Sequence, residues 1–119
     1  MAEDVRSERV SYLRVILEIP EIGFQRELEA LIDTGFTQGI AIPAELLPPG
    51  AAAISEAPIR LADGELRYVP AYLGVVRIGA TRIDFVSVFE LGKEPIIGLD
   101  IITQFRVTID RASSMTFEP

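Results

Sequence analysis

Short apolar segments separated by glycine, proline and Asp-Gly turns recur along the whole sequence, and this pattern constrains the fold more than any other feature. Residues 10–19 are apolar and rich in β-branched side chains, with Val15 and the alternate positions after it on one face of an extended chain. A turn at residues 20–23 follows, and residues 24–32 alternate between apolar and polar side chains. We therefore predict a hairpin whose second strand ends at Asp33.

Two more hairpins are predicted in the middle of the chain. The first has strands at residues 58–61 and 66–69 on either side of Asp63-Gly64, a dipeptide that favours a tight hairpin turn. We expect this hairpin to protrude. The second joins residues 72–78 to residues 83–89 through a turn that contains Gly79.

Shorter elements account for the rest of the chain. They are a strand at 39–42, a helical turn opened by Pro43, a loop at 51–57, a strand at 96–98, a short helix at 101–105 capped by Asp100, and strands at 106–109 and 115–117. Residues 1–9 are polar and are predicted to form an N-terminal tail, so that the domain extends over residues 10–119. The result is an all-β domain with one short C-terminal helix, in which two similar halves form one lobe.

Composition and charge exclude several classes of function. With 119 residues, 49% of them hydrophobic and 24% charged, the chain is typical of a single soluble domain. A net charge of -7 disfavours partners such as nucleic acid and anionic membranes, since both bind cationic patches. The N-terminus lacks the apolar core of a signal peptide, and no apolar run approaches the roughly 20 residues of a membrane span. A cytoplasmic location is the resulting expectation.

The sequence contains neither cysteine nor histidine. Disulfides and thiolate chemistry are therefore excluded, and the usual imidazole base and commonest metal ligand are missing. Any catalysis must use carboxylates or hydroxyls.

Asp33 is the carboxylate that most needs an explanation, because it directly follows the apolar pair Leu31-Ile32 at a strand end. Alone, the triplet Asp33-Thr34-Gly35 is a weak signal, and an ordinary turn residue is the simpler interpretation. About sixty residues later, however, Ile96-Ile97-Gly98 forms a second apolar-apolar-glycine element that leads into a helix. Two distant motifs in this order are more specific than either motif alone.

The two motifs together resemble those of the retropepsin-like aspartic proteases, the single-lobe relatives of pepsin that include the retroviral proteases. The resemblance covers most of the chain from about residue 10 onward. The string at residues 33–43 is more similar to prokaryotic members than to viral ones, which usually have a small residue where Phe36 stands. The resemblance implies a single-lobe acid protease barrel, all-β apart from its short C-terminal helix.

The resemblance also implies a function. Aspartic proteases use two carboxylates that share one proton, because both cannot ionise at close range. One chain supplies one such residue, so Asp33 would meet its own copy across a two-fold axis. The expected protein is a homodimeric aspartic endopeptidase that cleaves a peptide or protein substrate with an activated water and needs no metal, no cofactor and no covalent intermediate.

Roles for other residues follow from the same resemblance. Thr34 would hydrogen-bond across the dimer, and Gly35 would let its N–H approach the carboxylate. The hairpin with Asp63-Gly64 at its tip would be the flap that closes over the substrate. Ile96-Ile97-Gly98 would lie beneath the Asp33 loop and support it.

Two departures from the viral pattern keep a second function open. Phe36 places a large ring beside the expected site of the water, where it would reshape the substrate pocket. The flap tip has one glycine, whereas viral flaps are glycine-rich. A non-catalytic dimer that binds a peptide or a protein partner through the same groove is therefore the alternative. Asp100 is a competing candidate for the second carboxylate, but its position before a helix favours a cap.

Overall fold

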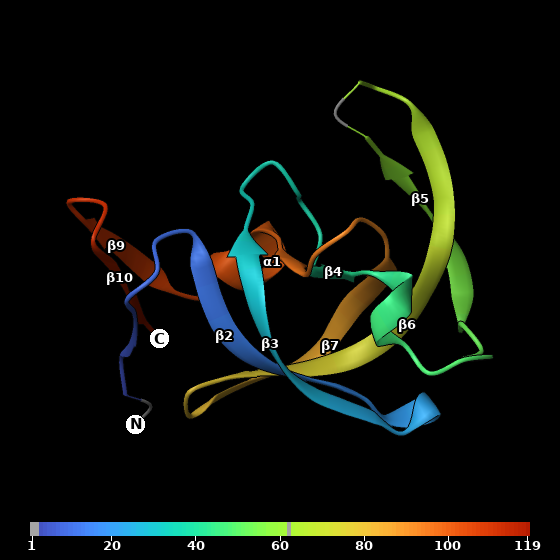
Figure 1. The fold of residues 1–119 in the computed structure, drawn as a ribbon, viewed down its shortest axis with the longest axis horizontal. Coiled ribbons are helices and arrows are strands. Elements are labelled where there is room, and N and C mark those ends of the chain that lie inside the picture. Colours follow the sequence, from blue (N-terminus) through green and yellow to red (C-terminus); the bar gives the residue numbers. More distant parts are fainter. Residues whose placement is uncertain (1–2, 62) are drawn as a thin grey trace.

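A computed structural model of the protein describes residues 3–61 and 63–119. Within these residues the chain forms ten strands, two single 3-10 turns and one short α-helix (Figure 1). In chain order the elements are β1 (Val5–Ser7), β2 (Tyr12–Ile19), η1 (Pro20–Ile22), β3 (Phe24–Ile32), β4 (Ile40–Ile42), η2 (Ala44–Leu46), β5 (Ser55–Arg60), β6 (Leu66–Ile78), β7 (Thr81–Glu90), β8 (Ile96–Ile97), α1 (Leu99–Ile102), β9 (Arg106–Asp110) and β10 (Ser114–Glu118).

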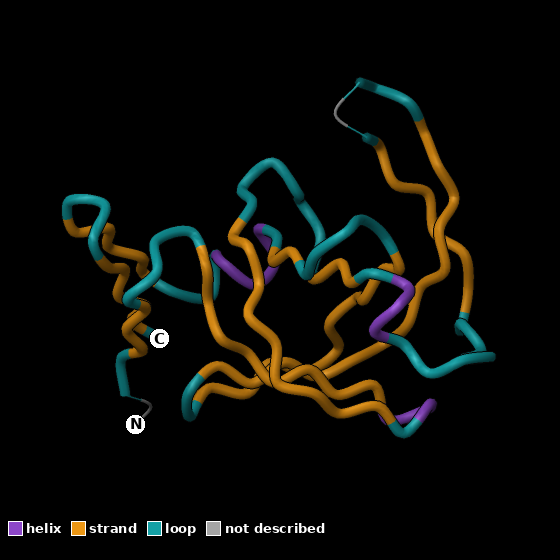
Figure 2. The backbone as a smooth tube through the Cα atoms, in the orientation of Figure 1, coloured by secondary structure: helices purple, strands orange, loops and turns teal. Residues whose placement is uncertain are grey.

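Most strands belong to a closed barrel. The larger sheet has the order β2-β3-β8-β4-β7-β6-β5, and antiparallel pairing of β2 with β6 closes it. Strand β5 lies outside this closure, and the β5–β6 hairpin extends well beyond the barrel (Figure 1). Figure 2 shows how little of the backbone is helical. The predicted all-β barrel with one short C-terminal helix is confirmed.

The core fills the barrel because side chains along the strands alternate between buried and more exposed, as the sequence predicts. In β2, Leu13, Val15, Leu17 and Ile19 are all at most 2% exposed, while the residues between them are more exposed. Extended strands place successive side chains on opposite faces, so one face of β2 lines the interior. None of the helices in residues 3–61 and 63–119 is both long and apolar enough to cross a membrane.

A second, three-stranded sheet lies beside the barrel, with the order β1-β10-β9. Its central strand β10 buries Met115 and Phe117, and the ring of Phe105 meets that of Phe117 edge-on with centroids 6.0 Å apart. Residues 5–7, assigned by the sequence to a polar tail, pair with β10 as strand β1. The segment predicted as a tail thus contains a strand, and its Val5 packs against the apolar core although its neighbours in the sequence are charged.

Two strand boundaries also differ from the prediction. Strand β6 is continuous through Pro70, where two separate strands were expected, and β5 begins at Ser55 inside the predicted loop. Both differences have one cause. The two strands pair over their whole shared length, from Ser55 opposite Ala71 to Arg60 opposite Leu66, and this pairing does not depend on large side chains.

Candidate active site

Asp33 lies at the point where β3 leaves the sheet. The last residues of β3 run parallel to β8, and the backbone N–H of Asp33 donates to the carbonyl of Ile97 at 2.9 Å. The chain then turns, and the N–H of Phe36 donates back to the carbonyl of Asp33 at 3.1 Å. The carboxylate is therefore fixed to the end of a paired strand, and its side chain is partly exposed.

Gly35 gives the carboxylate a backbone partner. Its N–H donates to Oδ1 of Asp33 at 2.9 Å, and a β carbon at position 35 would lie 3.1 Å from the same oxygen. A side chain at this position would crowd the hydrogen bond. Thr34, between the two, is exposed in the single chain, so a contact with a second chain stays a prediction.

The start of helix α1 supports the Asp33 loop from below. The N–H groups of Gly98, Leu99 and Asp100 donate to the carbonyls of Gly39, Phe36 and Gln38 at 2.8, 2.8 and 3.2 Å. The first N–H groups of a helix have no partner within it, so here the loop supplies the acceptors. A β carbon at Gly98 would clash with the carbonyl oxygens of Phe36 and Gln38, which explains why this position holds glycine.

The prediction that Asp100 caps the helix was wrong. Helix α1 begins at Leu99, its N-cap is Gly98, and no side chain caps it. Asp100 lies inside the first turn and is exposed. A side-chain cap is unnecessary because the carbonyls of the Asp33 loop already accept from the first turn.

Phe36 joins the Asp33 loop to the β5–β6 hairpin. Its half-buried ring meets Phe89 edge-on, with the ring centroids 6.1 Å apart, a separation within the usual range of aromatic pairs. The two rings belong to a second apolar cluster, separate from the barrel core, that contains Ile59 and Val69 of the hairpin and Ala71 at its base. The ring of Phe36 was predicted to reshape a substrate pocket. In the structure, part of this ring packs against Phe89.

The hairpin tip is a hydrogen-bonded turn. Leu61 donates to the carbonyl of Glu65 at 2.8 Å, and Gly64, with a φ of +87°, donates to the carbonyl of Leu61 at 2.9 Å. The carboxylate of Asp63 accepts from the N–H of Glu65 at 2.8 Å, and Arg60 donates to the carbonyl of Gly64 at 2.9 Å. Asp63 is therefore a turn residue within the hairpin. Position 62 lies outside the described residues.

The single chain does not enclose Asp33. A hollow of about 660 Å³ beside the N-terminal segment has Tyr12 and Glu29 among its lining residues, and one of about 490 Å³ lies between the base of the hairpin and Gln38. Asp33 lines neither of them. Among the described residues, no three acidic side chains are grouped in a way that would hold a metal ion.

No protein-family model and no curated protein matches this chain. Solved structures do match it, among them a retropepsin-like aspartic protease from Rickettsia conorii. The match has a TM-score of 0.66 and 13% sequence identity, and it covers 98% of this chain and 91% of that chain. The chain has the retropepsin-like fold. At 13% sequence identity, this match shows a similarity of fold alone.

Within this retropepsin-like chain, the structure brings most of the predicted site residues together. Asp33, Thr34, Gly35 and Phe36 form one loop, and Ile96-Ile97-Gly98 lies directly against it. Asp63 and Gly64 are at the far tip of the hairpin, whose strands contact the loop through the apolar cluster around Phe36 and Phe89. Asp-Thr-Gly occurs once in the sequence, at residues 33–35.

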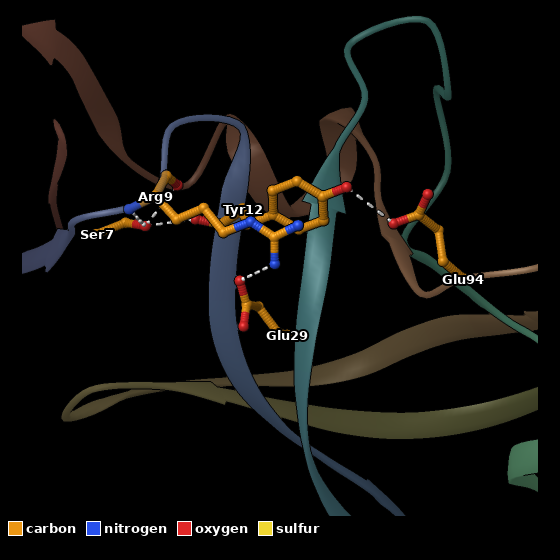
Figure 3. A network of polar contacts seen from close by, with 5 residues as sticks. All are labelled: Ser7, Arg9, Tyr12, Glu29 and Glu94. Carbon is orange, nitrogen blue, oxygen red and sulfur yellow. Dashed lines mark hydrogen bonds and ion pairs between the residues drawn. The ribbon is translucent and has the colours of Figure 1, made fainter. Parts of the chain in front are cut away.

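A polar network around Tyr12 and Glu29 was not predicted from the sequence (Figure 3). The guanidinium of Arg9 stacks on the ring of Tyr12, 3.6 Å from its centroid, and donates to Glu29 on β3 at 2.7 Å. The hydroxyl of Tyr12 donates to Glu94 at 3.2 Å, and Ser7 donates to the carbonyl of Tyr12 at 2.6 Å. The network holds the N-terminal segment against the loop that leads into β8. The two carboxylates of the network, Glu29 and Glu94, are too far from Arg9 and Tyr12 in the sequence to give a local signal.

Proposed function

We propose that this protein is a homodimeric aspartic endopeptidase in which Asp33 of each subunit supplies one carboxylate of a catalytic pair. The observation that carries the proposal is the Asp33 loop within a retropepsin-like fold. A carboxylate at a strand end, hydrogen-bonded to the N–H of Gly35, rests on the first turn of α1. A turn residue needs no such support from a distant part of the chain.

The chemistry requires the two carboxylates in different protonation states. Two carboxylates at close range share one proton. The ionised Asp33 takes a proton from water, and the water oxygen attacks the carbonyl carbon of the scissile bond. The protonated Asp33 of the other subunit donates a hydrogen bond to the carbonyl oxygen. When the C–N bond breaks, the leaving nitrogen receives a proton from the pair, and no covalent intermediate forms.

The proposed substrate is an extended segment of a peptide or protein. It would lie between the Asp33 loops and the two β5–β6 hairpins, whose backbones bind an extended chain by strand addition. Closure of the hairpins would exclude water from the reaction. Such a groove needs two chains, which agrees with the absence of Asp33 from the two hollows described above.

The test is a comparison of Asp33→Asn with Asp100→Asn on a diverse peptide library in mildly acidic buffer. Asn keeps the size of Asp33 and an oxygen for the N–H of Gly35, but it cannot act as a base. We expect the first variant to lose cleavage at least about a hundredfold. The second, which changes an exposed carboxylate on the neighbouring helix, should cleave like the wild type. Cleavage that survives Asp33→Asn would refute the proposal.

A non-catalytic dimer that binds peptides through the same groove is the second candidate. The observations in its favour are the ring of Phe36, which packs beside Asp33, and the four hydrogen bonds that order the hairpin tip. Wild-type protein that cleaves no library member but retains selected peptides would support this candidate. Asp33→Asn should then bind the same peptides.

A further inference from the structure

The end of β3 is held on both of its edges where it leads into Asp33. On one edge, the N–H of Asp33 donates to the carbonyl of Ile97 on β8 at 2.9 Å. On the other edge, the N–H of Ile32 donates to the carbonyl of Ser11, just before β2, at 2.7 Å. Consecutive N–H groups of an extended strand point to opposite edges, so β3 needs a partner on each side. The position of Asp33 therefore depends on where the carbonyl of Ser11 is held.

Ser11 holds that carbonyl with a strained backbone. Its φ is +73°, in the left-handed region that residues other than glycine rarely adopt. A strained conformation of this kind persists only where the surrounding structure imposes it, and such residues are concentrated at functional sites. The contacts that impose it on the exposed Ser11 come from the next residue, Tyr12.

Tyr12 is fixed at four points, two of them on its backbone and two on its side chain (Figure 3). Its N–H donates to the carbonyl of Arg9 at 3.1 Å, and its own carbonyl accepts from the hydroxyl of Ser7 at 2.6 Å. The guanidinium of Arg9 covers its ring, and its hydroxyl donates to Glu94 at 3.2 Å. These contacts restrict the peptide group that joins Ser11 to Tyr12.

The contact made by the hydroxyl spans β3. Tyr12 pairs with Leu31 on one edge of β3, and Ile96 pairs with the same residue on the other edge. Glu94 is two residues before Ile96, so the hydrogen bond from Tyr12 to Glu94 crosses the end of the strand (Figure 3). The two segments that flank the end of β3 are thus bound to each other.

We propose that Tyr12 is a positioning residue for Asp33. Through Arg9 and Glu94 it holds Ser11 in the left-handed conformation, and the carbonyl of Ser11 fixes the end of β3 from which Asp33 projects. The effect on catalysis rests on the proposed function, because two carboxylates share a proton only at close range. A small displacement of reacting groups slows the chemical step, so kcat is the quantity that should change.

The first test measures kcat and KM on the library peptide that the wild type cleaves fastest. Tyr12→Phe and Glu94→Ala each remove the hydrogen bond across β3, and each should lower kcat about three- to tenfold while KM changes less than about twofold. Both act through one bond, so the double variant should lose no more than either single variant. Glu94→Gln keeps an acceptor for the hydroxyl and should retain most of the activity.

Arg14→Ala is the matched control for this test. It removes another contact between β2 and β3, the ion pair with Glu27 at 3.3 Å, which lies further along the strands from Asp33. Its kcat should equal that of the wild type. Thermal unfolding of every variant excludes a general loss of folded protein. A higher KM at unchanged kcat, or losses that multiply in the double variant, would overturn the positioning role.

The second test is a rescue through Ser11→Gly. Glycine adopts a φ of +73° without the penalty of a side chain, so this variant should melt no lower than the wild type. In the Ser11→Gly background the carbonyl depends less on Tyr12, and Tyr12→Phe should lower kcat less than about twofold. A loss as large as in the wild-type background would overturn the argument from strain.

The third test, amide hydrogen exchange, separates this inference from the proposed activity. It is made in Asp33→Asn protein, where cleavage plays no part. Tyr12→Phe should accelerate exchange at Ile32 about threefold or more, whereas residues 24–28, at the other end of β3, should exchange as before. Unchanged exchange at Ile32 would overturn the inference and leave the protease proposal standing. Faster exchange at Ile32, in a protein whose wild type cleaves nothing, would uphold the hold of Tyr12 on β3 and refute the protease.

Discussion

Gly98 lies directly against Phe36, so that a β carbon at position 98 would stand 2.5 Å from the carbonyl oxygen of Phe36 and 2.7 Å from Cδ2 of its ring. This contact lets the first turn of α1 reach the Asp33 loop. Any side chain at position 98 would separate the helix from the carbonyls that accept its hydrogen bonds. The geometry of the loop therefore depends on a residue far from it in the sequence.

We expect Gly98→Ala to lower the free energy of unfolding by about 2–3 kcal/mol, because the added methyl meets backbone that cannot move aside. Urea denaturation measures the change. Gly23→Ala is the matched control: φ is +64° there and nothing lies within 4 Å, so the cost should be near 1 kcal/mol, from backbone strain alone. Equal losses for the two variants would contradict the close contact.

Phe36→Ala should destabilise the protein by about 2 kcal/mol, less than for a fully buried ring, because the side chain is half-buried. The lost edge-on contact with Phe89 should also loosen the hairpin, so that amide hydrogen exchange accelerates in residues 55–69. The control is Phe85→Ala, which removes a ring that is 81% exposed and should change stability by less than about 0.5 kcal/mol. Unchanged exchange in the hairpin would show that the ring does not hold it.

Tyr72 gives the folding stability a dependence on alkaline pH. Burial raises the pKa of its hydroxyl above the ordinary value of 10.0, and the charge of Glu90 raises it further. The folded state thus holds this proton more tightly than the unfolded state. The stabilisation is present below pH 10 and is lost as pH rises through the folded pKa.

The corresponding variant is Tyr72→Phe, in which this loss disappears. The difference in unfolding free energy between wild type and Tyr72→Phe should shift against the wild type as pH rises above 10. Tyr68→Phe, at a site 63% exposed, serves as the control and should track the wild type throughout. A Tyr72→Phe difference that is flat with pH would contradict the raised pKa.

Arg9→Ala should cost about 1 kcal/mol, since it removes both the ion pair with Glu29 and the stacking on Tyr12. Arg6→Ala removes an ion pair of equal length, 2.7 Å to Glu8, that has no aromatic partner, and should cost little. Thermal unfolding at low and high salt distinguishes the contributions, because screening weakens the ion pair more than the packing. Equal effects for the two arginines would argue against a role for the stacked ring.

The elements predicted well from the sequence are those fixed by neighbouring residues. The turns at Gly23 and Gly79 and the hairpin around Asp63-Gly64 depend on local backbone preferences. In β2, the alternation of apolar and polar residues in the sequence indicates which face of the strand is buried. Asp33 at a strand end could be located in the same way. Its role as part of a catalytic pair stays a prediction.

Features set by distant partners escaped prediction. Helix α1 begins before Asp100 because the carbonyls of Phe36 and Gln38, brought from elsewhere, accept its first N–H groups. Strand β1 forms because β10 is available beside it, although its three residues, Val5-Arg6-Ser7, lie among charged neighbours in the sequence. The stacking of Arg9 on Tyr12 is local, but the carboxylates that complete that network come from β3 and from the loop before β8.

The parallel pairing of Leu31 with Ile96 has a consequence for the way the protein is made. Because synthesis runs from the N-terminus, a ribosome releases β3 well before β8 and α1. A nascent chain that has reached β7 therefore holds every residue of the Asp33 loop and none of the groups beneath it. Translation thus delays the shaping of this loop until α1 has been made, and a product that terminates after β7 would contain Asp33 without the helix that supports its loop.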